Sequence, residues 1–318
     1  MTVQPAARAI RQDLLDAAAL PRRANRHLIR NVMAALIVLT LAFVLQGLAR
    51  NKGFQWSTVR HYLFVRQVLE GLGRTLLLTF WSVLIAIILG TVLANMRLSA
   101  NPVLRVVAAG YVWFFRSIPL LVLLIFTFNF SLLYPHLSIG IPFGPSFLGF
   151  ATVNTVSAFW LAVIAFGLQQ AAYTSEVVRA SLLSVPKGQR EAAAAIGMPP
   201  MRAMVRIVLP QAMRVAVPPI ANETINLLKA TALVAFISVP DLLYSVEQIY
   251  SQNFQVVPLL TVAAIWYIVL VSIMSIGQLM IERRMRRGVR YGRRSRPDAA
   301  QAKLANDPAL NLTEEGIL

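Results

Sequence analysis

Residues 75–96 read TLLLTFWSVLIAIILGTVLANM, a run of 22 residues without a charged side chain between Arg74 and Arg97. About 20 predominantly apolar residues are enough for an α-helix to cross the hydrocarbon core of a bilayer. The whole 318-residue chain has the same character, because 57% of its residues are hydrophobic and only 14% are charged. In soluble domains, about 45–50% of the residues are apolar and about 25% are charged. The sequence therefore predicts an all-α fold, a polytopic membrane helix bundle.

Charged residues and turn formers divide the rest of the chain into further apolar segments. Residues 31–49 form the first segment, and the run at 75–96 is the second. The others are about 106–133, about 155–175, about 207–228 and a segment within 248–281. Prolines and glycines between the third and fourth segments predict a loop. We expect about six transmembrane helices, of which the fifth is the most polar.

Basic residues set the expected orientation. The chain holds 30 Lys and Arg against 13 Asp and Glu, which gives a net charge of +17. Cytoplasmic loops and tails of membrane proteins carry the excess of Lys and Arg. A cytoplasmic N-terminus places 23 of the 30 basic residues inside. We therefore expect a multi-pass protein with both termini cytoplasmic, whose charge meets anionic lipid headgroups rather than nucleic acid.

The two ends of the chain are predicted to lie outside the bundle. Residues 1–30 form a cytoplasmic tail, in which 6–20 have the pattern of a short amphipathic helix on the membrane face. Residues 285–318 begin with an arginine-rich run, which we interpret as an anchor on anionic lipid. After Pro297 the composition becomes polar and predicts disorder.

The residue inventory argues against several classes of enzyme. The chain has no cysteine, three scattered histidines and no Gly-Lys-Ser/Thr loop for a nucleotide phosphate. Disulfide scaffolds, thiolate or histidine metal sites and ATPases are therefore disfavoured. We expect no catalytic residue, no metal site and no cofactor bound by this chain.

The segment between the fourth and fifth apolar runs predicts a short helix. Residues 186–197 read PKGQREAAAAIG. Pro186 suits a first helical turn, and the alanines favour helix. Gly197 can adopt the left-handed conformation that ends a helix, and Pro199 prevents its continuation. The spacing predicts about three helical turns with small side chains, which a partner's surface can approach closely; the alternative is a solvated linker.

The same segment carries a longer pattern. Glu191-Ala192-Ala193, then Gly197, then Ile207-x-Leu209-Pro210 resembles the signature loop of permease subunits of ATP-binding-cassette (ABC) importers. Five flanking stretches resemble the polar amino acid branch: Gly71–Leu76, Phe115–Leu120, Tyr173–Arg179, Pro210–Arg214 and Asn222–Lys229. The resemblance covers about residues 68–284. Its usual core has five helices, so residues 31–49 are expected to be an added transmembrane helix.

Six positions depart from the pattern of this branch. They are Ser117, Ile118, Gln169, Gln170, Ala230 and Ala232. Several of them fall in the expected pore region, so they bear on which solute is carried.

The resemblance implies a type I ABC importer permease in the bacterial inner membrane. Two permease chains, identical or different, form the pathway, and a binding protein outside delivers a polar amino acid or a similar solute. A separate ATPase holds ATP and Mg and drives the loop helix, within a coupling loop at about 180–206. The residues implied in coupling are Pro186, Lys187, Gly188, Glu191, Ala192, Ala193 and Gly197.

Polar residues inside apolar segments are functional candidates, because charges at membrane depth are costly. Asn222, Asn226 and Lys229 share one helix face, with Glu223 beside them. They are predicted to line the pathway; alternatively, they satisfy backbone groups freed by Pro218 and Pro219 or pack between subunits.

Two further sets of charges lie near the membrane. Glu176 and Arg179 are three residues apart and are predicted to form an ion pair. Arg116, just before Pro119, marks a hinge or pairs with an acid on another helix, and the pair is favoured.

Two other classes of protein remain as alternatives. A self-contained secondary transporter or channel would work without an ATPase, but no internal repeat is evident. A membrane-embedded enzyme would need a catalytic set of residues, and none is evident. Solute-stimulated ATP hydrolysis by the assembled complex discriminates both from an importer permease.

Overall fold

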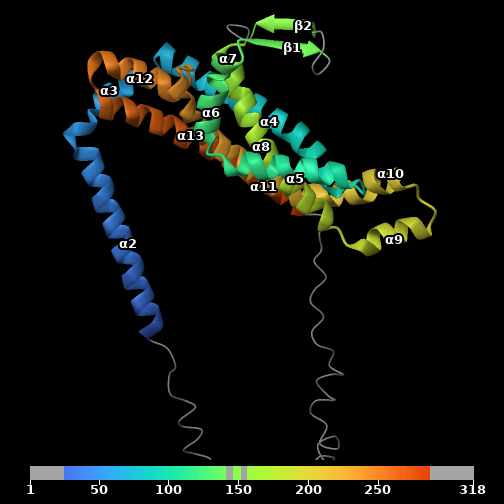
Figure 1. Ribbon diagram of the computed structural model, residues 1–318. Helices are drawn as coiled ribbons and strands as arrows, with labels where there is room; N and C mark the ends of the chain where they lie inside the picture. Colours follow the sequence, from blue (N-terminus) through green and yellow to red (C-terminus); the bar gives the residue numbers. More distant parts are fainter. Residues whose placement is uncertain (1–24, 141–145, 152–155, 287–318) are drawn as a thin grey trace, which may run out of the picture. The chain divides into compact units, whose positions relative to one another are not determined.

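The computed structural model describes residues 25–140, 146–151 and 156–286. The chain divides into two compact units, residues 1–59 and residues 60–318. The amphipathic helix expected at 6–20 and the tail expected after residue 286 lie outside the described residues. Figure 1 shows the order of the elements along the chain.

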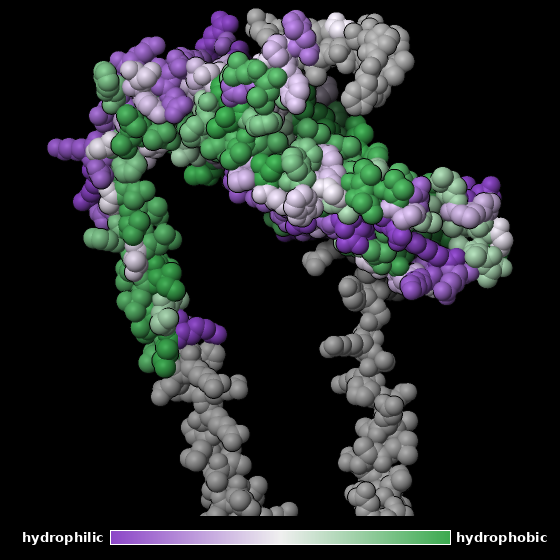
Figure 2. Space-filling model, viewed as in Figure 1, coloured by the Kyte–Doolittle hydropathy of each residue, from purple (hydrophilic) through white to green (hydrophobic). Residues whose placement is uncertain are grey.

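The first unit contains one long apolar helix, α2 (Asn25–Arg50). Every described side chain from Leu28 to Arg50 is exposed, and Figure 2 shows hydrophobic residues along nearly the whole helix. A short 3-10 turn, η1 (Lys52–Phe54), follows, and Asn51 caps it by accepting a hydrogen bond from Gly53 N. A helix that is apolar on all sides suits a lipid environment.

The second unit is built around two helices, α4 (Arg66–Leu98) and α8 (Ala158–Leu183). They run in the same direction, because Ser82 Oγ donates to Val163 O at 3.3 Å and Arg97 pairs with Glu176 further along both helices. Gly90 packs against Thr174 so closely that a Cβ there would lie 2.8 Å from the Thr174 Cβ. Small residues thus bring the two backbones together, as in other membrane helix pairs.

The expected third span is broken into α5 (Pro102–Ser117) and α6 (Leu120–Phe128), which meet at an angle of 99°. Pro119 causes the break, since the residue before a proline avoids the helical region and Ile118 is extended. The Ile118 carbonyl, lost to the helix, accepts a hydrogen bond from Gln169 Nε2 at 2.7 Å. A glutamine that lowers the apolarity of α8 therefore satisfies backbone freed by the bend.

A short helix, α7 (Phe130–Leu133), leads to a two-stranded antiparallel hairpin. Its strands are β1 (His136–Gly140) and β2 (Ser146–Ala151), with His136 opposite Ala151. The sequence predicted only a loop here. The proline and glycine residues that suggested it fall largely between the strands, so the all-α description holds for the bundle and not for this connection.

The remaining elements follow α8 in order: α9 (Lys187–Ala195), α10 (Pro200–Ala203), a π-helical turn η2 (Met204–Val208), α11 (Leu209–Ala230), a 3-10 helix η3 (Thr231–Ile237), α12 (Leu242–Asn253) and α13 (Val256–Arg286). A further short helix, α3 (Trp56–Tyr62), precedes α4. Helix α11 stays continuous through Pro218 and Pro219, and the departures from α-helical geometry lie at its two ends.

Among the described residues, four helical segments are long and apolar enough to cross a membrane, or five if the bent α5–α6 pair counts as one. The four are Leu28–Arg50, Arg66–Leu98, Pro200–Ile237 and Val256–Met285. Helix α8, expected as the fourth of six spans, has 26 residues but is too polar to join this set. Twelve of its residues are buried, so its polar side chains face other helices rather than lipid.

Helix α12 packs on the first turns of α4 through Gly71. A Cβ at Gly71 would lie 2.4 Å from Ser245 Oγ and 2.6 Å from the Asp241 carbonyl oxygen. We expect Gly71→Ala to push α12 away and to destabilise the fold by about 1–3 kcal/mol. Gly73→Ala is the matched control, since nothing lies within 4 Å of its added Cβ. Thermal unfolding of the detergent-solubilised variants checks this; equal melting temperatures would mean that the contact is looser than described.

Candidate functional site

Helix α9 forms as the sequence predicted. It begins after Pro186, and it ends where Gly197 adopts a φ of +72°. Gly197 N donates to Ala194 O at 2.9 Å, and Met198 N donates to Ala193 O at 3.0 Å. These two bonds are the Schellman pattern, which satisfies the last carbonyls of a helix. The side chain of Arg190 fixes α9 to the end of α8 by donating from Nη2 to Leu182 O at 3.2 Å.

Most of the residues implied in coupling lie on the surface of α9 and its flanks. Exposed members are Pro186, Lys187, Gly188, Glu191, Ala192 and Gly197. Ala193 is different, because only 2% of it is exposed. Its side chain packs within its own chain, so Ala193 is not part of the exposed surface of α9. The exposed side of α9 is the part that a partner can reach.

An ion-pair cluster joins the ends of α4 and α8. The Glu176 carboxylate accepts from Arg179 Nη2 at 3.0 Å, which confirms the predicted pair. Its other oxygen pairs with Arg97, a partner from α4 that the sequence did not suggest. Between 23% and 32% of each of these three side chains is exposed. Each oxygen of the Glu176 carboxylate is paired with an arginine, so Glu176 links α4 to α8. Because both oxygens are already paired, this carboxylate is not available to bind a solute.

Arg116 does not pair with an acid in the described part of the chain. Its guanidinium lies over the ring of Tyr173, 5.1 Å from the centroid, in a cation–π contact. The favoured interpretation as an ion pair is therefore wrong. The 99° bend between α5 and α6 begins two residues later, so Arg116 lies beside the change in chain direction.

Two of the four polar α11 residues predicted to line the pathway contact neighbouring helices. Asn222 Oδ1 accepts from Gln278 Nε2 of α13 at 3.1 Å, and Glu223 Oε2 accepts from Gln170 Nε2 of α8 at 3.3 Å. These bonds go to side chains, not to backbone freed by the prolines. Asn222, Asn226 and Lys229 are exposed, whereas Glu223 is half-buried. This face is open to a pathway or to a second subunit.

Glu223 stands out among these residues by its charge. In the described part of the chain, no basic group lies within salt-bridge distance of its carboxylate, and its one hydrogen-bonding partner, Gln170, is neutral. An anionic group within a membrane-spanning segment favours a cation nearby. No group of three or more His, Asp or Glu side chains that could hold a metal ion occurs among the described residues.

A buried acid at the start of α12 was not identified from the sequence. Asp241 is fully buried; its Oδ1 accepts from Tyr244 N at 2.8 Å and its Oδ2 accepts from Tyr267 OH at 3.3 Å. Leu242 N donates to Thr75 Oγ1 at 3.1 Å, which ties the same turn to α4. An aspartate before an apolar-periodic segment is a helix-capping signal and could have indicated this role. Burial raises the pKa of Asp241 to about 6.

The raised pKa predicts a pH dependence of stability. The folded chain holds the Asp241 proton more tightly than the unfolded chain, in which the pKa is 3.8. Stability from this group is therefore fully present below about pH 4 and is lost as the pH rises through about 6, by about 3 kcal/mol in all. Asp241→Asn keeps a capping oxygen and avoids the buried charge. We expect the variant to melt higher than wild type at pH 8 and equally at pH 4; a constant difference across this range would contradict the assignment.

Comparison with known proteins gives a family match over most of this structure. Residues 71–287 match the family described as "Binding-protein-dependent transport system inner membrane component". The "Arginine transport system permease protein ArgU" of Corynebacterium glutamicum is 41% identical over 269 residues, which cover 83% of this chain and 82% of that protein. The "L-cystine transport system permease protein TcyB" of Bacillus subtilis is 38% identical and covers 69% of this chain and 86% of that protein.

Solved structures of amino acid transporters also match this chain. A chain of the "Crystal structure of an amino acid ABC transporter with histidines" is 30% identical, with a TM-score of 0.59, and the match covers 70% of this chain and 95% of that chain. A chain of an inward-facing MetNI methionine ABC transporter has a TM-score of 0.54 at 23% identity, which shows a shared fold. The family match begins within α4 and runs past the end of α13, so it includes α9, the ion-pair cluster and the polar face of α11. The chain belongs to the family of inner membrane components of binding-protein-dependent transport systems.

Proposed function

We propose that this chain is the permease subunit of an ATP-driven importer for amino acids. The observation that carries the proposal is α9, a capped helix that is tied to the end of α8 in a chain of this family. Its exposed surface combines small residues, Gly188, Ala192, Ala194 and Ala195, with charged ones such as Glu191. A partner ATPase binds this surface, and its motion is passed through α8 and α10 to the bundle. The chain itself binds no nucleotide or metal and catalyses no reaction.

The proposed assembly has four kinds of component. A binding protein delivers the solute, ATPase subunits carry ATP and Mg, and a second permease chain, identical or different, completes the pathway. The exposed polar face of α11 suits either the pathway or this second chain. Both termini and α9 lie on the cytoplasmic side of the cell membrane, in agreement with the distribution of basic residues.

We further propose a solute with a cationic side chain. Glu223 supports this, because it is a half-buried carboxylate without a basic partner among the described residues. The relatives named as arginine permeases, from Corynebacterium glutamicum at 41% identity and from Bacillus subtilis at 34% identity, point in the same direction.

Uptake into proteoliposomes tests the substrate. The assembled complex is supplied with ATP inside and with its binding protein outside, and labelled arginine, lysine, glutamine, glutamate and cystine are compared. We expect ATP-dependent accumulation of arginine and lysine above the others. Preference for glutamate or cystine would overturn the cationic specificity and leave the importer assignment intact, whereas the absence of ATP-dependent uptake of any amino acid would overturn both.

A further inference from the structure

A small polar cavity lies between the first turns of α4 and helix α12. Its volume is about 90 Å³, and its lining includes Gln67, Glu70, Gly71 and Arg74 of α4 and Tyr244 and Gln248 of α12. Pockets that hold a whole small molecule have about 300–1,000 Å³. This cavity is therefore of the size for a side-chain headgroup rather than for an entire solute.

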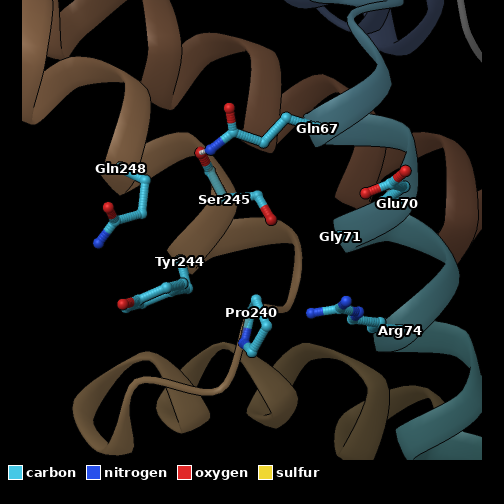
Figure 3. A pocket seen from close by; sticks show the side chains of 8 residues that line it. All are labelled: Gln67, Glu70, Gly71, Arg74, Pro240, Tyr244, Ser245 and Gln248. Carbon is cyan, nitrogen blue, oxygen red and sulfur yellow. Dashed lines mark hydrogen bonds between the residues drawn. The ribbon is translucent and has the colours of Figure 1, made fainter.

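The unpaired charge at the cavity is positive. Glu70 is already paired, since its Oε1 accepts from Arg66 Nε at 2.7 Å. Arg74 has no acidic group within salt-bridge distance in the part of the chain that the structure describes. Figure 3 shows its guanidinium extending from α4 toward Pro240, on the wall of the cavity. A guanidinium with free donors is suited to bind a carboxylate in a two-bond geometry.

The walls of the cavity are held in place before any ligand arrives. Gln67 Nε2 donates to Ser245 O at 3.3 Å, across from α4 to α12. Gly71 allows the two helices to approach, and Asp241 caps the first turn of α12. A preorganised site loses less conformational entropy on binding, which favours affinity.

The cavity lies at the opposite end of α4 from the coupling machinery. Arg74 is near the start of α4, whereas Arg97 is near its end, where it pairs with Glu176. Helix α9 follows the end of α8 on that same side. With α9 on the cytoplasmic side, the cavity faces outward, where the binding protein of this family of transport systems meets the membrane component.

We propose that this cavity is a docking site for an aspartate or glutamate side chain of the solute-binding protein, with Arg74 as its ionic partner. The proposal rests on the importer function proposed above. Helix α12, which forms one wall of the cavity, is connected through η3 to α11, the helix that carries Glu223. A carboxylate bound in the cavity therefore contacts the same continuous stretch of chain as the proposed solute site.

Charge reversal at Arg74 tests the proposal. The complex with Arg74→Glu, with Arg74→Gln, or without a substitution is reconstituted, and the binding protein's affinity and its stimulation of ATP hydrolysis are measured. We expect both Arg74 variants to weaken binding, and Arg74→Glu by about tenfold or more. Arg60→Glu is the matched control, because Arg60 is exposed on α3 next to α12 but does not line the cavity.

A second set of variants identifies the partner. Each surface aspartate and glutamate of the binding protein is changed to arginine and combined with Arg74→Glu, and we expect one of these reversals to restore affinity. Equal losses in the Arg60 and Arg74 variants, unchanged affinity in Arg74→Glu, or loss without rescue by any reversal would each overturn the site. Wild-type uptake, measured in the same preparation, tests the importer function separately.

Discussion

Ala192→Arg in α9 should reduce ATP-driven uptake about 100-fold while the protein remains folded in the membrane. Ala192 is exposed on a helix of small residues, and a partner that packs against it has no room for a long cationic side chain. Overfilling a packed contact costs about 1–3 kcal/mol, and a charge buried without a partner adds several more. The measurements are co-purification of the ATPase, ATP hydrolysis stimulated by the binding protein, and uptake.

Two variants separate docking from folding. Ala100→Arg changes an exposed alanine in the turn between α4 and α5, at the same end of the bundle but outside α9, and should leave uptake unchanged. Ala193→Arg places a charge where the side chain is 2% exposed within its own chain, so it should lower the melting temperature. Normal uptake by Ala192→Arg would show that the exposed side of α9 does not meet the ATPase.

Glu223→Gln should strongly lower the uptake of cationic amino acids while the protein stays folded. The substitution keeps the shape of the side chain and a hydrogen bond to Gln170, and it removes only the charge. Truncating one partner of a desolvated charge pair costs about 2–5 kcal/mol, which corresponds to a loss of at least about 30-fold in apparent affinity. The apparent KM for arginine uptake measures this loss.

Neutral solutes provide the internal comparison for Glu223→Gln. Their uptake should change little or improve, because the lost interaction is specific for a cation. Glu282→Gln on α13 is the matched control acid: Glu282 is also half-buried and also accepts a hydrogen bond from a glutamine, Gln278, at 2.8 Å, but it lies near the end of α13. We expect this variant to leave the KM for arginine unchanged. An unchanged KM for arginine in Glu223→Gln would remove Glu223 from the solute site.

Local signals in the sequence predicted local structure well. Pro186 and Gly197 defined the ends of α9, because proline and a left-handed glycine each have one favoured place in a helix. The spacing of Glu176 and Arg179 predicted their ion pair, because side chains three residues apart are neighbours on a helix surface. A hinge beside Pro119 was the less favoured of the two interpretations of Arg116, and the structure has a 99° bend there between α5 and α6.

Contacts between distant segments were not predictable in this way. Arg97 is 79 residues from Glu176 in the sequence, and no spacing rule links them. Gln169 and Gln170 looked like departures from a pattern, but one satisfies the Ile118 carbonyl and the other contacts Glu223. Such polar residues lower the mean hydropathy of α8 and so count against a membrane span. They are tolerated in α8 because they contact other helices rather than lipid.

As the permease subunit of an importer, this chain should transport only when a separate ATPase drives it. The direct test is uptake of labelled arginine into proteoliposomes that contain the chain alone, the chain with its ATPase, or the full set with the binding protein, each with ATP or with a non-hydrolysable analogue inside. We predict accumulation only with the full set and hydrolysable ATP. Arginine accumulation by the chain alone, driven by an ion gradient, would rule out an ATP-driven importer and identify a self-contained transporter.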